Sequence, residues 1–414
     1  MNAEPSNKVK TVEPTVSSYR WVILALIWLI LVWGDVALVI AGPLAHALIP
    51  DVNLTLPQFV SLTTFGLLGG GIAALVGGSW GDRIGIKKAI GVGTIMLGVF
   101  WALRALGLGY SFLAVCTFIG GAGIGLVLPN LPKLISTWFA RADIGMATGI
   151  YGTGFWIGMA MGLGLAVPWF GSSWSLAYLV TGIANLACGI LWLVFGREAP
   201  QGVSLPRVQL SLGSALKKVV KLRNLWIAGF MLMLALSAIS TFATLIPTSL
   251  ETVYHVSPAV AGFAVSLSMI GMVVGSYVVP MLSDKIGVRK PFLVGSGILW
   301  GVCIFFAWLV APHPGMWPLL FFAGFGVGAA FTSCFILPIE APGIRPEIIA
   351  TGSALVTVVG YITTGFLPTY GVAAIATVSF NGAYVSLLAF GLIYAIVAGT
   401  CLLESGPKVR TRIQ

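Results

Sequence analysis

The stretch GDRIGIKK at residues 81–88 returns in altered form as SDKIGVRK at residues 283–290. Asp82, Gly85 and Lys88 in the first copy are identical to Asp284, Gly287 and Lys290 in the second, at a constant separation of 202 residues. Two more pairs of segments repeat at a separation of 203 residues: GAGIG at 121–125 with GFGVG at 324–328, and ATG at 147–149 with ATG at 350–352. The chain therefore contains two halves of one design.

The composition indicates the solvent of this chain. Of its 414 residues, 58% are hydrophobic and only 8% are charged, and the mean hydropathy is +1.01. A soluble domain carries about 25% charged residues. Water could not solvate so apolar a surface, so the sequence predicts a multi-pass protein of the cytoplasmic (inner) membrane.

Twelve charge-poor runs are long enough to cross a bilayer, which takes about 20 apolar residues per helix. They lie at about 21–42, 58–81, 89–109, 110–132, 146–170, 174–196, 225–249, 258–281, 291–311, 316–339, 348–372 and 380–403. The runs do not alternate in polarity as the strands of a membrane β-barrel do. The predicted fold class is all-α, with twelve transmembrane helices in two pseudo-symmetric six-helix bundles.

The domain organisation follows from these runs. We expect a tail over 1–20, a first bundle over 21–196, a linker over 197–224, a second bundle over 225–403 and a tail over 404–414. The linker carries two prolines and six basic residues.

Basic residues predict the orientation in the membrane. The tails, the linker and the even-numbered loops hold 21 of the 22 lysines and arginines, which places both termini in the cytoplasm by the positive-inside rule. The net charge of +10 thus reflects topology, and nucleic-acid binding is not expected.

Two charged residues, Asp35 and Arg104, lie inside apolar runs. A helix rises 1.5 Å per residue, so they sit about 21 Å and about 24 Å from the cytoplasmic ends of their runs. A charge at this depth usually faces a partner or a cavity. Two interpretations stay open: a structural ion pair, or one shared site for a substrate or a coupling proton.

The stretch GGSWGDRIGIKK resembles the loop between the second and third helices of the major facilitator superfamily, and the resemblance extends over nearly the whole chain. The matching positions are Gly78, Asp82, Arg83 and Gly85, whereas Ile86 stands where a base is common and Lys87 follows it. This resemblance implies secondary transport of a small solute by alternating access.

The repeated loop is predicted to act as a conformational latch between the two bundles. Its residues are Gly78, Asp82, Arg83, Gly85, Lys87, Asp284, Gly287 and Arg289. Carboxylates are stabilised at the positive N-terminus of a helix. By the arrangement of the family, Asp82 is expected near 347–349 and Asp284 near 143–145.

The family places its cavity between the halves, and polar or aromatic residues near mid-span are the candidate substrate-binding residues. They are Arg104, Asp35, Tyr151, Trp156, Thr241, Tyr361 and Ser333. An arginine binds carboxylates and oxyanions through its planar fork. The segment 102–139 is similar to the cyanate-permease branch of the superfamily, which tends to carry an arginine in its first helix where this chain has Asp35. Asp35 is therefore the candidate proton-coupling residue.

These observations favour symport of a small organic or inorganic anion, such as a monocarboxylate, with a proton as a candidate coupling ion. The alternative is polyspecific efflux of hydrophobic compounds by a drug:proton antiporter. An enzyme is not expected, because the sequence places no catalytic constellation at membrane depth. No cofactor or metal is expected, since the five cysteines are scattered singly. The expected partners are a small-molecule substrate and membrane lipid, with the chain acting as a monomer.

Overall fold

The computed structural model describes residues 17–200, 212–341, 343–364 and 371–404, and over these ranges its regular structure is entirely helical. Most of the two predicted tails, and residues 201–211 of the predicted linker, lie outside the described residues.

The first half contains one long helix in each of the first six apolar runs. These are α1 (Arg20–Val39), α3 (Leu56–Ile84), α4 (Ile86–Leu103), α5 (Tyr110–Val127), α7 (Ile144–Gly164) and α9 (Trp174–Phe195). Short helical segments lie between them, namely α2 (Ala45–Asp51), η1 (Arg104–Leu106), α6 (Asn130–Trp138), η2 (Arg141–Asp143) and α8 (Ala166–Phe170).

The second half repeats this order. Its long helices are α11 (Arg223–Tyr254), α12 (Pro258–Ile286), α13 (Lys290–Val310), α14 (Met316–Cys334), α16 (Ile349–Thr364) and α18 (Phe380–Ile396). The shorter segments are α10 (Leu212–Val219), α15 (Leu337–Glu340), η3 (Pro346–Ile348), α17 (Ala373–Val378) and η5 (Val397–Cys401). Each of the twelve expected runs thus contains a long helix, and residues 365–370 of the eleventh run lie outside the described residues.

Within the described residues, nine helical segments are long and apolar enough to cross a membrane, which agrees with a multi-pass protein. The long helices α3, α7 and α16 lie outside that group. Helix α3 has a well-defined start, because the Thr55 hydroxyl accepts the N–H of Gln58 at 3.4 Å and the Gln58 side chain accepts the N–H of Thr55 at 2.9 Å.

The two halves pack by the same plan. In the first, α3 and α4 pack on α5, α4 on α9, and α1 on α7; in the second, α12 and α13 pack on α14, α13 on α18, and α11 on α16. One contact repeats in detail: a Cβ on Gly121 would collide with the carbonyl oxygen of Gly66, and one on Gly324 with that of Ser268. Small residues allow membrane helices to approach this closely. The internal duplication read from the sequence therefore extends to helix packing.

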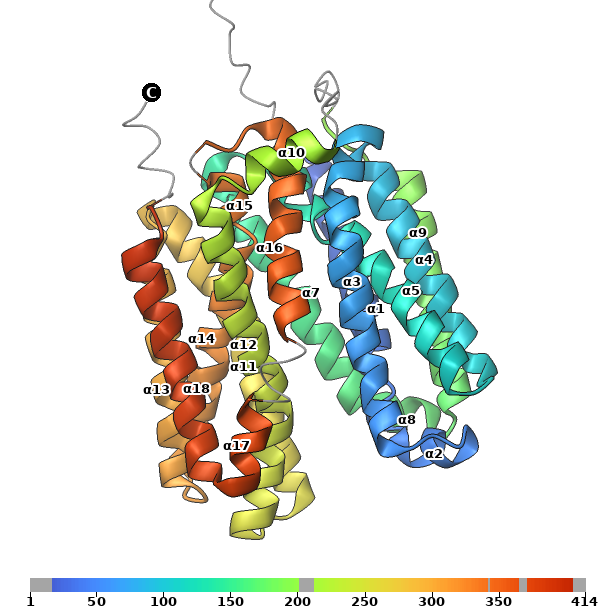
Figure 1. Cartoon of the computed structure of the whole chain (residues 1–414), viewed down its shortest axis with the longest axis vertical. Coiled ribbons are helices and arrows are strands. Elements are labelled where there is room, and N and C mark those ends of the chain that lie inside the picture. Colours follow the sequence, from blue (N-terminus) through green and yellow to red (C-terminus); the bar gives the residue numbers. More distant parts are fainter. Residues whose placement is uncertain (1–16, 201–211, 342, 365–370, 405–414) are drawn as a thin grey trace, which may run out of the picture.

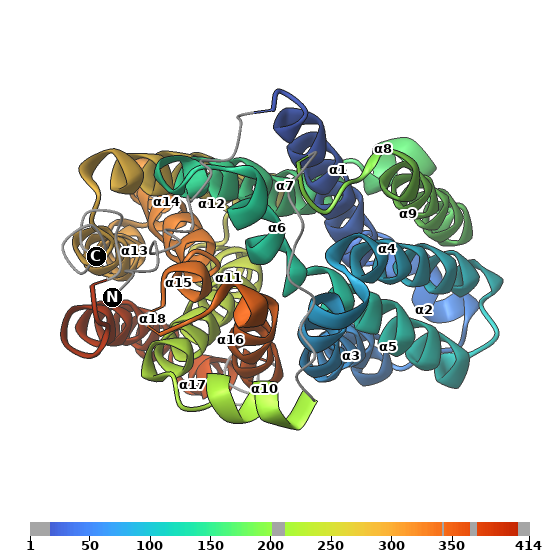
Figure 2. The same ribbon diagram turned by 90° about the horizontal axis from the view of Figure 1, so that it is seen from above.

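The bundles lie side by side and meet mainly through two pairs of helices, α3 with α16 and α7 with α12 (Figures 1 and 2). Helices α10 and α15 lie at the top of Figure 1, at the end where the loops carry the basic residues. We call this the cytoplasmic end, after the orientation that those residues predict.

Candidate functional site

A cavity of about 340 Å³ lies between the two halves. The first half contributes most of its wall through α1, α3, α5 and α7, and the second half adds residues of α11, α14 and α16. Its side chains are mainly apolar and aromatic. The polar or hydrogen-bonding members are Asp35, Arg104, Thr117, Trp156, Tyr178, Ser240 and Tyr361.

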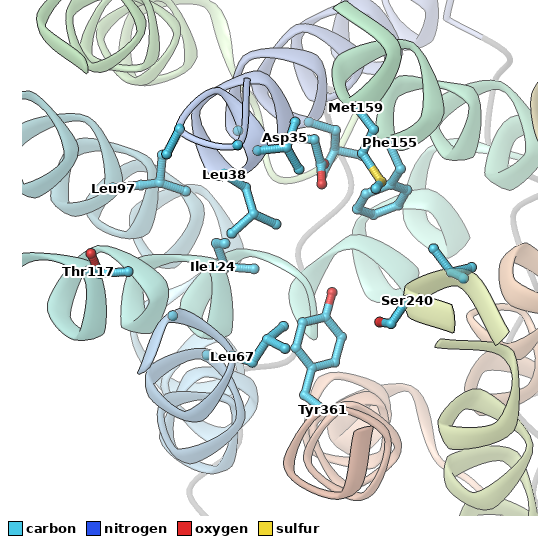
Figure 3. Close-up of a pocket in the computed structure, with 18 of the residues that line it drawn as sticks. Asp35, Leu38, Leu67, Leu97, Thr117, Ile124, Phe155, Met159, Ser240 and Tyr361 are labelled. Carbon is cyan, nitrogen blue, oxygen red and sulfur yellow. The ribbon is translucent and has the colours of Figure 1, made fainter. Parts of the chain in front are cut away.

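Asp35 on α1 is half-buried and projects into this cavity (Figure 3). It has no hydrogen bond or ion pair with any residue that the structure describes. Tyr361 on α16 points toward it from the opposite half. One side chain from each half therefore faces the same space.

Arg104 opens the turn η1 after α4, and it is only 3% exposed. Its Nη2 donates to the carbonyl oxygen of Ala37 at 2.9 Å, near the end of α1 where carbonyls lack helical partners. Its guanidinium carbon lies 4.2 Å from the ring centroid of Tyr178 and 4.8 Å from that of Trp101. Both distances suit a cation–π contact.

Arg104 makes one hydrogen bond to the described residues, through Nη2, and its Nε has no partner among them. No carboxylate in the described ranges forms an ion pair with this guanidinium. Asp35 and Arg104 thus line one cavity without an ion pair between them in this structure. The structural ion pair is thus not formed in this structure, and the shared site stays a hypothesis.

The other candidate substrate-binding residues divide into two groups. Trp156 and Tyr361 line the cavity together with Asp35 and Arg104. Tyr151, Thr241 and Ser333 are buried outside its wall, and the Thr241 hydroxyl donates to the carbonyl oxygen of Ser237 within its own helix at 2.7 Å.

The cavity also contains residues that the sequence did not single out. Tyr178 lies on α9, and Thr117 lies on α5 among glycines and apolar residues. Phe155 and Phe331 meet edge to face with their centroids 5.3 Å apart, one from each half. No spacing pattern would have marked these four residues.

The first copy of the repeated loop joins the two halves at the cytoplasmic end. Asp82 accepts a hydrogen bond from the Thr351 hydroxyl at 2.7 Å and another from the Thr351 N–H at 3.3 Å. Lys133, from the same half as Asp82, lies 2.6 Å from its other oxygen. Thr351 is in the first turn of α16, two residues beyond the expected segment 347–349.

Gly78 is needed for this approach. A Cβ at this position would overlap the carbonyl oxygen of Ala350 and lie 2.7 Å from the Cβ of Ala354. Helices α3 and α16 could not meet there with a larger residue.

The second copy of the loop makes the related contact on the other side. Asp284 accepts the N–H of Met146 at 2.9 Å, one residue beyond the expected segment 143–145. Arg289 lies 2.6 Å from Asp284 and also forms a two-pronged bond with Glu340, at 2.9 Å and 2.7 Å. Burial alone would lower the pKa of the Arg289 guanidinium, but hydrogen bonds and charge from Glu340, and then the charge of Asp284, raise it above its usual range.

The remaining loop residues shape the turns. Gly85 and Gly287 have φ of +102° and +83°, a conformation that favours glycine. Glu198 accepts the N–H of Lys87 at 3.3 Å, whereas Arg83 is exposed. In the second half Glu404 accepts the N–H groups of Arg289 at 2.7 Å and Lys290 at 3.1 Å. These two glutamates were not among the predicted latch residues, although each lies within two residues of the last long run of its half.

Comparisons with known proteins agree with this architecture. The family pattern described as Major Facilitator Superfamily matches residues 24–368 and 229–413. The gallate transporter of Pseudomonas putida is 26% identical over 44% of this chain and 41% of its own length. The gentisate transporter of Corynebacterium glutamicum is 23% identical over 78% of this chain and 75% of its own. The chain spans about two fifths of the length of the gallate transporter and of the hexuronate transporter of Bacillus subtilis.

Among solved structures, the proton:xylose symporter XylE bound to 6-bromo-6-deoxy-D-glucose superimposes with a TM-score of 0.72, at 18% identity. The superposition covers 95% of this chain and 98% of that one. At so low an identity, this likeness supports the fold alone.

Proposed function

Because this chain belongs to the major facilitator superfamily and is a multi-pass secondary transporter, we propose that its cargo is a small organic anion of the monocarboxylate class, moved together with a proton. The observation that carries the proposal is the Arg104 guanidinium, which lines the cavity with its Nε unpartnered and no ion pair to a described carboxylate.

An anion would satisfy this arginine better than any neutral solute. A buried cation without a counter-ion is costly, and a bidentate carboxylate offsets that cost with two charge-assisted hydrogen bonds. Tyr178 lies against the guanidinium and carries a buried hydroxyl without a partner in the described ranges, which gives the carboxylate a further donor. The carboxylate end of the cargo therefore belongs beside Arg104.

The rest of the cavity suits the apolar body of an organic acid. Trp156, Phe155 and Phe331 supply aromatic surface, and a volume of about 340 Å³ lies at the small end of the range for ligand sites. The names of two relatives, a gallate transporter and a gentisate transporter, agree with an aromatic carboxylate. We therefore place monocyclic aromatic acids first among the candidate cargoes, ahead of cyanate.

Proton coupling rests on Asp35. Ionisable residues inside a membrane commonly belong to proton pathways. A carboxylate that reaches the cavity without a described partner can bind a proton in one orientation of the transporter and release it in the other. Tyr361 lies in the opposite half and faces Asp35 across the cavity. The gain or loss of a proton on Asp35 would therefore alter the interaction between the two halves.

The second candidate is efflux of hydrophobic compounds. The largely apolar wall of the cavity, which includes Met159 and Leu163, favours this reading. Efflux of hydrophobic compounds gives no role to the N–H groups of Arg104 that lack a described partner, and for that reason we rank it second.

The test is uptake into proteoliposomes that contain the purified full chain. Labelled gallate, gentisate, benzoate and a simple aliphatic monocarboxylate are offered with and without an inwardly directed proton gradient. The proposal expects at least one acid to accumulate above equilibrium only with the gradient, and expects no transport of its uncharged amide. Transport of a hydrophobic dye together with indifference to every acid would establish the second candidate instead.

A further inference from the structure

Helix α10 differs from its neighbours in direction. It runs across the long helices at the cytoplasmic end (Figure 1), and it lies at the rim of the molecule when viewed from that end (Figure 2). Ala215 and Val219, one helical turn apart, are buried and pack toward α16. The protein itself thus covers the apolar face of α10.

The other face of α10 is basic. Lys217 and Lys218 are exposed, and Lys221 and Arg223 continue the cluster into the start of α11. None of the four forms an ion pair with a carboxylate in the described part of the chain. Four like charges within seven residues repel one another, so an anionic partner would stabilise them.

An exposed tryptophan sits beside these charges. Trp226, in the first turn of α11, is 44% exposed, and its Nε1 donates to the carbonyl oxygen of Val220 at 2.8 Å. Val220 is itself 45% exposed. Exposed tryptophans gather at the boundary between lipid and water, where the ring is in contact with apolar chains and the N–H with polar groups. The basic cluster therefore lies at the level of the lipid headgroups.

We propose that α10 and the start of α11 bind the headgroup of an anionic phospholipid in the cytoplasmic leaflet. Lys217, Lys218, Lys221 and Arg223 form the cationic part of this site, and Trp226 lies against the lipid below the headgroup. A basic cluster on an amphipathic helix is the usual recognition element for such lipids. A soluble polyanion would use the same charges but would not need the tryptophan.

The site lies next to the helix that closes the cytoplasmic end. Helix α10 packs on α16, and Thr351 in the first turn of α16 binds Asp82 of the other half. A bound headgroup would hold α10 against α16 and would thereby favour the closed cytoplasmic seam.

Quenching of tryptophan fluorescence by brominated lipids tests the binding without any transport assay. The full chain is placed in phosphatidylcholine nanodiscs with increasing fractions of brominated phosphatidylglycerol or, in parallel, brominated phosphatidylcholine. The signal of Trp226 is isolated by subtracting the signal of Trp226→Phe. Brominated phosphatidylglycerol is expected to quench at much the lower fraction, and high salt should weaken the difference.

The test variant carries Lys217→Gln, Lys218→Gln and Lys221→Gln. It should need at least about tenfold more phosphatidylglycerol for the same quenching, because each of the three lysines near the surface strengthens binding several-fold. The matched control carries Lys88→Gln, Arg141→Gln and Lys285→Gln, which removes the same charge from exposed positions at the same end and should stay within about twofold of the native chain. Equal quenching by the two lipids, or an equal loss in the control, overturns the proposal. Displacement of the lipid by soluble polyphosphate would identify a soluble ligand and also overturn it.

Discussion

Thr351 on α16 donates its hydroxyl hydrogen to Asp82 on α3 over 2.7 Å, and so ties the second half of the chain to the first. Both residues are buried, and both lie near the cytoplasmic ends of their helices. Met146 and Asp284 form the related contact on the other side of the seam at 2.9 Å. The structure is therefore closed toward the cytoplasm.

Replacing Thr351 with Val should loosen this seam. A hydrogen bond to a charged group contributes about 1.5–3 kcal/mol, so the ratio of the closed to the open state should fall at least about tenfold. Hydrogen exchange followed by mass spectrometry on peptides covering 144–150 and 349–356 should show faster exchange. Thr357→Val is the matched control, because the Thr357 hydroxyl donates within its own helix, to the carbonyl oxygen of Ser353 at 2.9 Å. Equal hydrogen exchange in the two variants would show that the Thr351 hydroxyl does not stabilise the closed seam.

Gly78→Ala should act at the same seam by steric means. The added Cβ would overlap the carbonyl oxygen of Ala350, and overpacking of this kind costs about 1–3 kcal/mol. We expect faster exchange at the seam and at least a fivefold drop in turnover. Gly295→Ala on α13 adds the same methyl group where nothing lies within 4 Å, and should leave both unchanged. A normal seam in Gly78→Ala would show that the helices adjust without cost.

Two substitutions of Arg104 should show separately how its charge and the shape of its guanidinium contribute to cargo binding. Arg104→Gln removes the cation and should reduce uptake of the preferred acid about a hundredfold, whereas Arg104→Lys keeps the charge without the fork and should lose about tenfold. The initial rate of uptake against cargo concentration is the measurement. The melting temperature of each variant must be followed too, because Arg104 also bonds the end of α1 at Ala37. Normal transport by well-folded Arg104→Gln would leave this residue with a structural role only.

Asp35→Asn should uncouple transport from the proton. The amide cannot take up or release a proton at ordinary pH, so accumulation driven by a proton gradient should vanish while exchange of labelled for unlabelled cargo continues. Both are measured in the same proteoliposomes. Loss of exchange as well would mean that Asp35 contacts the cargo directly. Retained accumulation would show that a residue other than Asp35 carries the coupling proton.

Most of the fold could be predicted from the sequence, because the apolar runs are local patterns and the two halves repeat them. Each apolar run became a helix, and the Gly121 and Gly324 segments, matched by their spacing, occupy equivalent contacts. The partners of Asp82 and Asp284 lay within two residues of the expected segments. That accuracy came from the family arrangement and not from any periodicity in the chain.

The site was less accessible to sequence reasoning because a cavity wall depends on how helices rotate. Thr241 and Ser333 look as polar as Ser240, yet only Ser240 lines the cavity. Tyr178 reaches Arg104 from a helix more than seventy residues later in the chain, and Ala37 offers only a backbone carbonyl, which no residue type announces. Such contacts follow from the packing of helices, which cannot be read from a single sequence.

Each acid at the cytoplasmic seam keeps a cation of its own bundle: Lys133 stays with Asp82, and Arg289 stays with Asp284. When the bundles separate, each carboxylate keeps its cation. The movement therefore breaks hydrogen bonds to the opposite helix but leaves no unpaired charge in a nonpolar medium. The energy difference between the two orientations can therefore remain small and reversible, as repeated cycling requires.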